Sequence, residues 1–238
     1  MGAVEERLDN IKKNIEKYRA RIALPQPQHG RTCQLICFGP SLLDTWREID
    51  RGGIVVSVSG AHDFVRDRAI VPTHHVEFDW RPHKALHVTE PSRETCFLLA
   101  SCSHPDMMAK VPDPVLWHAQ QNERENSLIK TLEPEAYLVP GGSSVGLRAI
   151  ELFNALGYRR FEIHGMDSSF TDIQWAGRHF GKSKEKRDII EVKVNDRKFK
   201  TSIAFLTYVD QFQSCKAANP HLSFVLHGDG LMQEMEKS

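Results

Sequence analysis

The sequence has almost no net charge and no long apolar run. Its 238 residues include 31 Lys and Arg against 31 Asp and Glu, so bulk electrostatics favours neither nucleic acid nor an anionic membrane as the main partner. No apolar run approaches the roughly 20 residues that a membrane-spanning helix needs. The N-terminal residues are acidic and lack the apolar core of a signal peptide. We therefore expect a cytoplasmic protein.

Cysteine is scarce and its spacing is uninformative. The five cysteines are an odd number and form no CxxC pair, which argues against a disulfide framework and against a structural zinc site. The twelve histidines are scattered along the chain. The adjacent pair His74 and His75 would point to opposite faces of a strand. Linear spacing thus predicts no metal site built from histidine or cysteine.

Two common nucleotide-binding loops are also missing. The chain has no GxGxxG fingerprint, and its glycine-rich segment 141–146 continues with Leu147 and Arg148 rather than with the Lys and Ser or Thr of a phosphate loop. A nicotinamide-dependent dehydrogenase and a P-loop kinase are therefore disfavoured.

What the chain does contain is a repeated arrangement in which a short apolar run ends in small or acidic residues. These runs are residues 34–38, 54–58, 75–78, 136–139 and 161–164. In an open parallel sheet, ligands bind beyond the carboxyl ends of the strands, where turns need glycine and helix N-termini attract anions. The arrangement predicts one site assembled from several strands, for a phosphorylated ligand.

The order of the elements predicts an α/β fold, a Rossmann-like doubly wound and mostly parallel sheet. A helix is expected from residue 41 to about residue 50, a further strand at 115–117, the clearest helix at 143–156 and a small inserted hairpin at 189–200. A helix at 202–218, a strand at 222–226 and a last short helix opened by residues 228–230 are expected to follow. The polar stretch 119–133 is expected to be a connecting excursion. Residues 168–188 are expected to be either a solvated loop or a lid over the site. We assign residues 1–30 to an N-terminal helix and linker, and 31–238 to a single nucleotide-binding transferase domain.

Residues 4–22 predict an amphipathic helix. Apolar side chains recur in steps of four and three from Val4 to Ile22. The stripe could dock on the helix's own domain, or it could form a short coiled-coil seam that makes a homo-oligomer.

Three residue groups could carry chemistry at the first and third strand ends. The turn formed by Gly39, Pro40 and Ser41 lets the backbone approach a phosphate, although a plain turn would look the same. Asp79 could hold Mg²⁺, which commonly uses one or two protein carboxylates. Arg81 could grip a phosphate, or it could simply pair with Asp79 at a turn.

Two further candidates follow the fifth run. Asp167 could be a second metal contact, could orient a substrate hydroxyl, or could cap the segment that follows it. His179 lies in the segment that could form a lid, where an imidazole could act as general acid or base; a polar surface role is the alternative.

Taken in order, these motifs resemble a known family. The series is 38–42, 58–61, 78–83, 141–146, 164–167 and 228–231. It is similar to the 6-hydroxymethylpterin diphosphokinase MptE-like family, which also covers motility-accessory-factor glycosyltransferases and is related in fold to bacterial sialyltransferases. The resemblance implies a Rossmann-like domain that binds a nucleotide. It also implies a cradle of Gly39, Pro40, Ser41, Ser59 and Gly60, with Gly142, Ser143 and Asp167 completing the pocket and Asp79 holding metal or phosphate.

The resemblance leaves three functions open. The first is Mg²⁺-dependent pyrophosphoryl transfer from ATP to a small alcohol such as a hydroxymethylpterin. The second is glycosyl transfer from a nucleotide-sugar of the CMP type, with His179 as acid or base. The third is a nucleotide- or sugar-binding accessory protein without turnover, which is supported by Phe38 and Ser59 standing where the sialyltransferases favour Asn.

Overall fold

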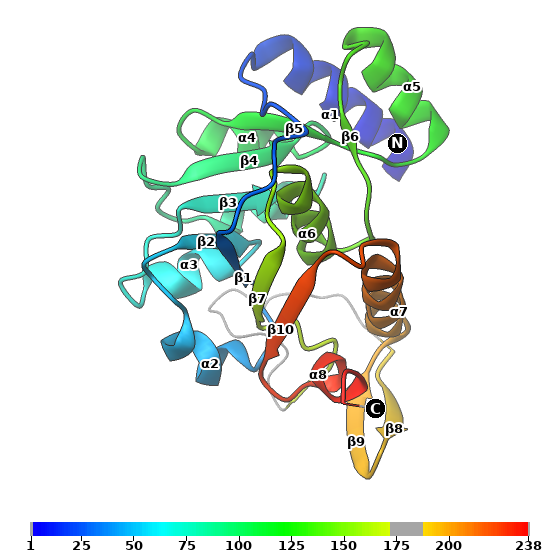
Figure 1. Cartoon of the computed structure of the whole chain (residues 1–238). Coiled ribbons are helices and arrows are strands. Elements are labelled where there is room, and N and C mark those ends of the chain that lie inside the picture. The colour runs from blue at the N-terminus through cyan, green and yellow to red at the C-terminus, as the bar shows by residue number, and fades with distance from the viewer. Residues whose placement is uncertain (1, 172–187, 238) are drawn as a thin grey trace.

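A computed structural model describes residues 2–171 and 188–237. Eight parallel strands form one twisted sheet in the order β10-β7-β1-β2-β3-β4-β5-β6 (Figure 1). The strands are β1 (Thr32–Ile36), β2 (Ile54–Val58), β3 (His74–Glu77), β4 (Cys96–Ala100), β5 (Val115–Ala119), β6 (Leu138–Val139), β7 (Arg160–His164) and β10 (Ser223–His227). The predicted α/β fold is confirmed.

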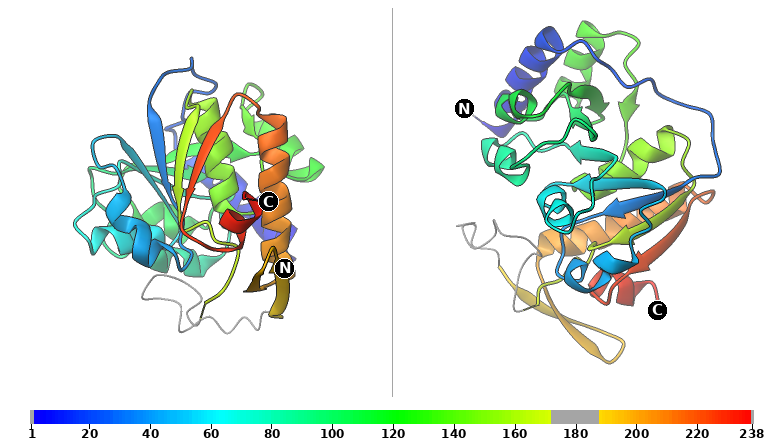
Figure 2. Two further views of the ribbon diagram at one scale, coloured as in Figure 1. Left: turned by 60° about the horizontal axis from the view of Figure 1, so that its bottom comes forward. Right: turned by 90° about the vertical axis from the view of Figure 1, so that its left-hand side faces the viewer.

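Helices cover both faces of the sheet, as the left-hand view of Figure 2 shows. Two long helices, α6 (Val145–Ala155) and α7 (Ile203–Ala218), lie on one face, and α2 (Leu42–Thr45) and α3 (Ala61–Arg66) lie on the other. The remaining helical segments are α1 (Ala3–Lys17), α4 (Pro105–Lys110), α5 (Glu123–Leu132), α8 (Leu231–Met235) and the 3₁₀ turns η1 (Trp46–Glu48) and η2 (Pro82–His87). In the described parts of the chain, every helix is too short or too polar to cross a bilayer.

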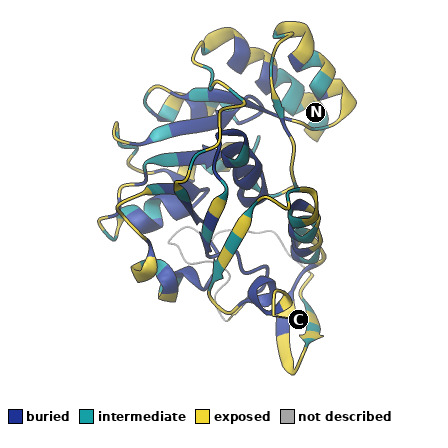
Figure 3. Cartoon of the chain, in the orientation of Figure 1, coloured by how far each residue is buried: buried dark blue, intermediate teal, exposed yellow. Residues whose placement is uncertain are grey.

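The central strands are apolar on both faces because both faces are covered. In β1 and the residue after it, Leu35 and Cys37 join the core beneath α6, whereas Ile36 joins the separate core beneath α2 and α3. Figure 3 shows the resulting band of buried residues through the middle of the molecule. Unbroken apolar runs, rather than alternating ones, are therefore the sequence signature of this sheet.

The N-terminal helix packs on its own domain, as one of the two expectations had it. Ile11 and Ile15 are buried in the main core, and the Asn14 side chain donates hydrogen bonds to the carbonyls of Ser101 and Ser103 at 2.9 and 2.7 Å. The helix ends at Lys17 rather than at residue 22. The reason is that the backbone of residues 20–22 exchanges hydrogen bonds with Leu116 of β5. Oligomerisation through this helix stays a prediction.

Two local predictions were wrong. The stretch expected to be a connecting excursion contains helix α5, which the Asn122 side chain caps by accepting from the Glu125 amide. The helix expected to run from residue 41 to 50 is only four residues long before it tightens into η1. Ser41 does not cap it, because its hydroxyl donates elsewhere (below).

The inserted hairpin is confirmed. Strands β8 (Ile190–Val194) and β9 (Arg197–Thr201) pair antiparallel around a turn at Asn195 and Asp196. They form a separate two-stranded sheet that projects beside α8 in Figure 1. The segment expected to be a loop or lid falls mostly on residues 172–187, which lie outside the described residues.

Candidate functional site

The strand order places a crevice between β1 and β7. Successive strands from β1 run outward to β6, and the chain then crosses back so that β7 pairs with the other side of β1. Such a reversal is where open α/β sheets bind ligands, outside the carboxyl ends of the strands. The two loops that leave these strands meet at once: the Gly39 amide donates to the Gly165 carbonyl at 2.7 Å.

Asp167 clamps the first loop from the second. Its two carboxylate oxygens accept from the Ser41 hydroxyl at 2.5 Å and from the Ser41 amide at 2.8 Å. Burial raises the pKa of Asp167, although the hydrogen bonds from Ser41 act in the opposite direction. Gly39 is required beside this clamp, because a Cβ there would lie 2.6 Å from the Gly165 carbonyl oxygen and against the Asp167 carboxylate. Asp167 thus holds the rim in shape.

A cavity of about 1310 Å³ opens beside this rim. That volume exceeds the usual range of roughly 300–1,000 Å³ for a single small-ligand site, so a nucleotide and a second substrate would both fit. The structure brings most of the predicted site residues to it: the lining includes Gly39, Pro40, Ser59, Asp79, Arg81, Ser143 and Asp167.

Asp79 follows β3, as predicted, but its carboxylate is already engaged. The Arg81 guanidinium donates to it through Nε at 3.0 Å and through Nη2 at 2.7 Å, and Lys84 Nζ lies 3.4 Å from Oδ2. Burial alone would raise the pKa of Asp79, but the hydrogen bond from Arg81 and the charges of Lys84 and Arg81 outweigh it and lower the pKa. The pairing of Asp79 with Arg81 was one of the two alternatives that the sequence left open.

Glu77 is a candidate that the sequence reasoning did not single out. It is 0% exposed and lines the cavity. One oxygen accepts from the amides of Phe78 and Asp79 at 2.8 and 3.0 Å, while Oε2 has no hydrogen-bond partner among the described residues. Burial raises the pKa of Glu77, and Lys84 opposes that shift. A carboxylate as the last residue of a short strand, two positions before Asp79, was the available signal.

Lys84 links the two neighbouring strand ends. Its ammonium group donates to Ser59 Oγ at 3.2 Å, in addition to its ion pair with Asp79. Ser59 follows β2 with a φ of 49°, and its hydroxyl also lies 2.9 Å from His87 Nδ1. Lys84 and His87 both come from η2, which folds over the site. Neither was singled out from the sequence.

Three predicted residues make close contacts within the protein, and two of them, Gly60 and Gly142, do not line the cavity. A Cβ on Gly60 would lie 2.7 Å from Phe38 Cδ1, and one on Gly142 would lie 2.6 Å from Gln211 Oε1. Ser143 donates to the same Gln211 oxygen through its amide and hydroxyl, at 2.8 and 3.0 Å. These contacts bring the turn before α6 against α7. His179 lies outside the described residues.

The cavity lining carries more basic than acidic groups. The basic side chains are Arg7, Arg81, Lys84, Lys110 and Arg148, and the acidic ones are Glu77, Asp79 and Asp167. Arg148 is buried, donates to the Val139 carbonyl at 2.9 Å, and has no partner for Nε within the described residues. Burial lowers the pKa of Arg148. Cations in a cleft with low-dielectric walls attract an anionic ligand.

The fold is that of a Rossmann-like domain with a cavity at the carboxyl ends of its strands, and comparison with known proteins shows its family. Residues 5–173 match the family described as 6-hydroxymethylpterin diphosphokinase MptE-like. The chain belongs to that family, and the resemblance noted from its motifs is confirmed. Membership supports a transferase-type function.

A solved structure shares the fold over the whole chain. This is the structure of MAf glycosyltransferase from Magnetospirillum magneticum AMB-1, with a TM-score of 0.70 and 12% sequence identity. The similarity covers 99% of this chain and 41% of that one, so this chain spans about two-fifths of that protein's length. No curated protein matches the sequence.

Proposed function

We propose that this chain is a nucleotide-dependent transferase whose site lies at the β1–β7 crevice. One observation carries the proposal: the ends of β1, β2, β3 and β7 line a single cavity in which basic groups surround a buried carboxylate. Lys84 and Arg81 would bind the phosphates, and Glu77 Oε2 would face the reacting group. Family membership supports the transferase class.

The first candidate reaction is pyrophosphoryl transfer from ATP to a small alcohol, such as a hydroxymethylpterin. The alcohol oxygen forms a bond to the β-phosphorus, the bond from that phosphorus to the oxygen shared with the α-phosphate breaks, and AMP leaves. Glu77 would accept the alcohol's proton, because its raised pKa brings it closer to the working range of a general base. Positioning and charge neutralisation by Lys84 and Arg81 would supply most of the acceleration.

The residues present would fit Mg²⁺. The Asp79 carboxylate, which lines the cavity, is a hard oxygen donor of the kind that this ion prefers, and Glu77 Oε2 stays available to accept the proton. When bound, Mg²⁺ would neutralise phosphate charge. For Asp79 to take part, Arg81 and Lys84 would have to exchange it for the phosphates.

The second candidate is glycosyl transfer from a nucleotide-sugar. The specific observation in its favour is that Arg81 already bonds both oxygens of Asp79, which suits chemistry without a metal. Glu77 would then deprotonate the acceptor hydroxyl. The oxygen of that hydroxyl forms a bond to the anomeric carbon, the bond from that carbon to the nucleotide breaks, and the nucleotide leaves. The fold shared with a glycosyltransferase is consistent with this reaction.

A thermal-shift panel of ATP, GTP, CTP, CMP and UDP, each with and without Mg²⁺, separates these candidates. A ligand at 100 times its Kd stabilises the fold by about 2.7 kcal/mol. Mg²⁺-dependent stabilisation by ATP supports the first candidate, and Asp79→Asn should then abolish the metal-linked part. Metal-independent stabilisation by CMP supports the second.

Mass spectrometry of products with candidate acceptors then tests for turnover. Nucleotide binding without formation of any product would support the third function, a non-catalytic accessory protein. Failure of every nucleotide to bind would overturn the proposed function.

A further inference from the structure

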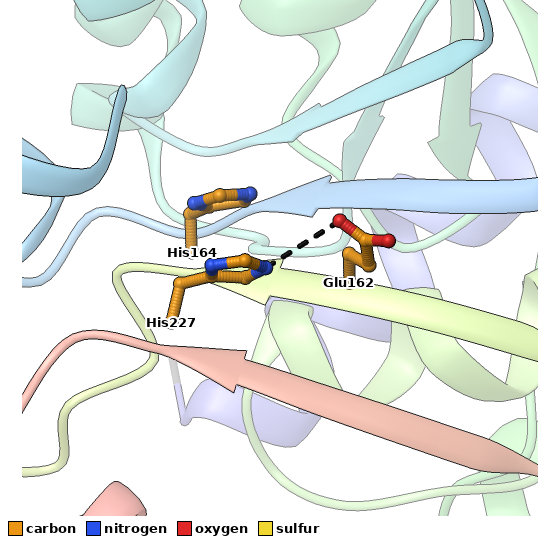
Figure 4. A group of neighbouring side chains, drawn as sticks. All are labelled: Glu162, His164 and His227. Carbon is orange, nitrogen blue, oxygen red and sulfur yellow. Dashed lines mark ion pairs between the residues drawn. The ribbon is translucent and has the colours of Figure 1, made fainter. Parts of the chain in front are cut away.

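A second polar cluster lies away from the cavity, on the face of the sheet that α2 covers. His164 and Glu162 are two residues apart on β7, and His227 stands opposite His164 in the register of β10. The imidazole rings stack with centroids 4.1 Å apart. One ligand atom from each of the three side chains lies within 4.8 Å of the others (Figure 4).

The hydrogen bonds around this cluster assign a free lone pair to each histidine. Glu48 of η1 lies 2.8 Å from His227 Nδ1, and Gln34 Oε1 lies 3.3 Å from His164 Nε2. Both partners are oxygen acceptors, so each of these nitrogens carries its proton. The opposite nitrogens, His227 Nε2 and His164 Nδ1, are buried without a hydrogen-bond partner in the described chain.

Glu162 supplies the third donor. Its Oε2 lies 3.4 Å from His227 Nε2, and the side chain is 35% exposed, which leaves the cluster open to an ion from solvent. We propose that Glu162, His164 and His227 bind a divalent transition-metal cation of the Zn²⁺ type, with Glu48 and Gln34 positioning the two imidazoles. Nothing in the proposed transferase reaction uses this site.

The donor set matches the chemistry of that cation. Two imidazole nitrogens and one carboxylate oxygen suit Zn²⁺, which binds three protein ligands and a water in open sites. Bonds of about 2.0–2.1 Å would bring tetrahedral ligand atoms to about 3.3 Å from one another. Because the two rings stack at an interplanar angle of 10°, both imidazoles would have to rotate before their lone pairs could point at one ion. The carboxylate on the far nitrogen of His227 is the outer-sphere arrangement that usually fixes a metal-binding imidazole.

The site would join three elements that carry the cavity rim. Glu48 follows the helix that starts after Ser41, His164 precedes the Asp167 loop, and His227 precedes the last glycine-rich turn. A bound cation would therefore raise the melting temperature of the domain.

The test is calorimetric titration of the full chain with Zn²⁺ alone, with melting temperature and Co²⁺ absorption as second readouts. We expect one saturable site per chain and a higher melting temperature. Glu162→Gln and His227→Gln should each raise the Kd at least tenfold, and Glu48→Gln by about 10–100-fold. The exposed His221→Gln and the half-buried Cys96→Ser are matched controls that should leave the Kd unchanged.

Unchanged melting temperatures in the presence of a chelator will show that the variants are folded. Absence of saturable Zn²⁺ binding by the native chain overturns the proposal. Binding that survives both Glu162→Gln and His227→Gln overturns it equally.

Discussion

Ser41 and Asp167 are 126 residues apart in the sequence and share two hydrogen bonds at the rim of the cavity. The contact joins the turn after β1 to the turn after β7, the two neighbouring strands at which the strand order of the sheet reverses. Asp167 is 3% exposed, so its carboxylate holds the turn at Ser41 from the protein interior. Whatever binds at this edge therefore meets a rim that is organised before the ligand arrives.

Replacing Asp167 by Ala should destabilise the fold by about 2–3 kcal/mol, because the Ser41 amide and hydroxyl lose their buried acceptors. Urea unfolding monitored by circular dichroism measures this loss. Asp229→Ala, at an exposed aspartate two residues before the last short helix, is the matched control. Equal losses in the two variants would contradict the role of the clamp.

Gly39→Ala should also destabilise the protein, by about 1–3 kcal/mol, because the added methyl group meets the Gly165 carbonyl and the Asp167 carboxylate. Gly30→Ala is its control, since a Cβ at Gly30 meets nothing within 4 Å. Chemical denaturation of both variants under the same conditions compares them. If Gly39→Ala is as stable as Gly30→Ala, the close approach of the two loops is not as described.

Lys84→Met should weaken binding of the nucleotide identified by the panel at least tenfold, because it removes the cation that joins Ser59 to Asp79. Its apolar stem is largely kept, so the fold should persist, with a lower melting temperature because Asp79 and Glu77 lose a neighbouring cation. Titration calorimetry provides the Kd, and the exposed Lys130→Met is the control. An unchanged Kd would remove Lys84 from the phosphate site.

Glu77→Gln should lower turnover about 10²-fold or more while nucleotide affinity stays within about threefold, since the amide keeps the shape but cannot accept the proton. The backbone amides of Phe78 and Asp79 would still find an oxygen. Steady-state kinetics with the identified substrate pair tests this, with exposed Glu135→Gln as the control. Turnover close to that of the native enzyme would exclude Glu77 as the general base.

Half-buried His74 predicts a loss of stability in mild acid. Burial lowers the pKa of His74 from 6.5 to about 4, so the unfolded chain binds a proton that the folded chain does not. The contribution of neutral His74 to the free energy of unfolding is complete above pH 6.5 and disappears as the pH falls to about 4. It is worth on the order of 3 kcal/mol. His74→Gln should flatten unfolding free energy against pH in this window, whereas exposed His221→Gln should not.

The strand and hairpin predictions, which depended on short stretches of sequence, succeeded. The apolar run before Gly39 is a buried strand, and the run before Asp79 is another. The hairpin turn at Asn195 and Asp196 also followed from residues a few positions apart. Such features are decided by side-chain burial and turn chemistry within the segment.

Predictions that depended on distant partners were incomplete. The chemistry of Glu77 depends on which neighbours bury it and on Lys84, which comes from the 3₁₀ turn beyond the strand. The N-terminal helix stops early because Leu116, almost one hundred residues away, takes the hydrogen bonds of the next segment. A periodic pattern of apolar residues does not show which distant residues will take these hydrogen bonds or bury these side chains.

The amino-acid sequence alone determined the alternation of strands and helices, and with it the edge of the sheet to which the small and acidic residues come. Only the tertiary structure decided what each of them does there. Parallel register sets residues far apart in the sequence side by side: His164 against His227, and the Asp167 loop against Ser41. Hydrogen bonds and desolvation act over a few ångströms of space, so neither pairing could be read from positions along the chain.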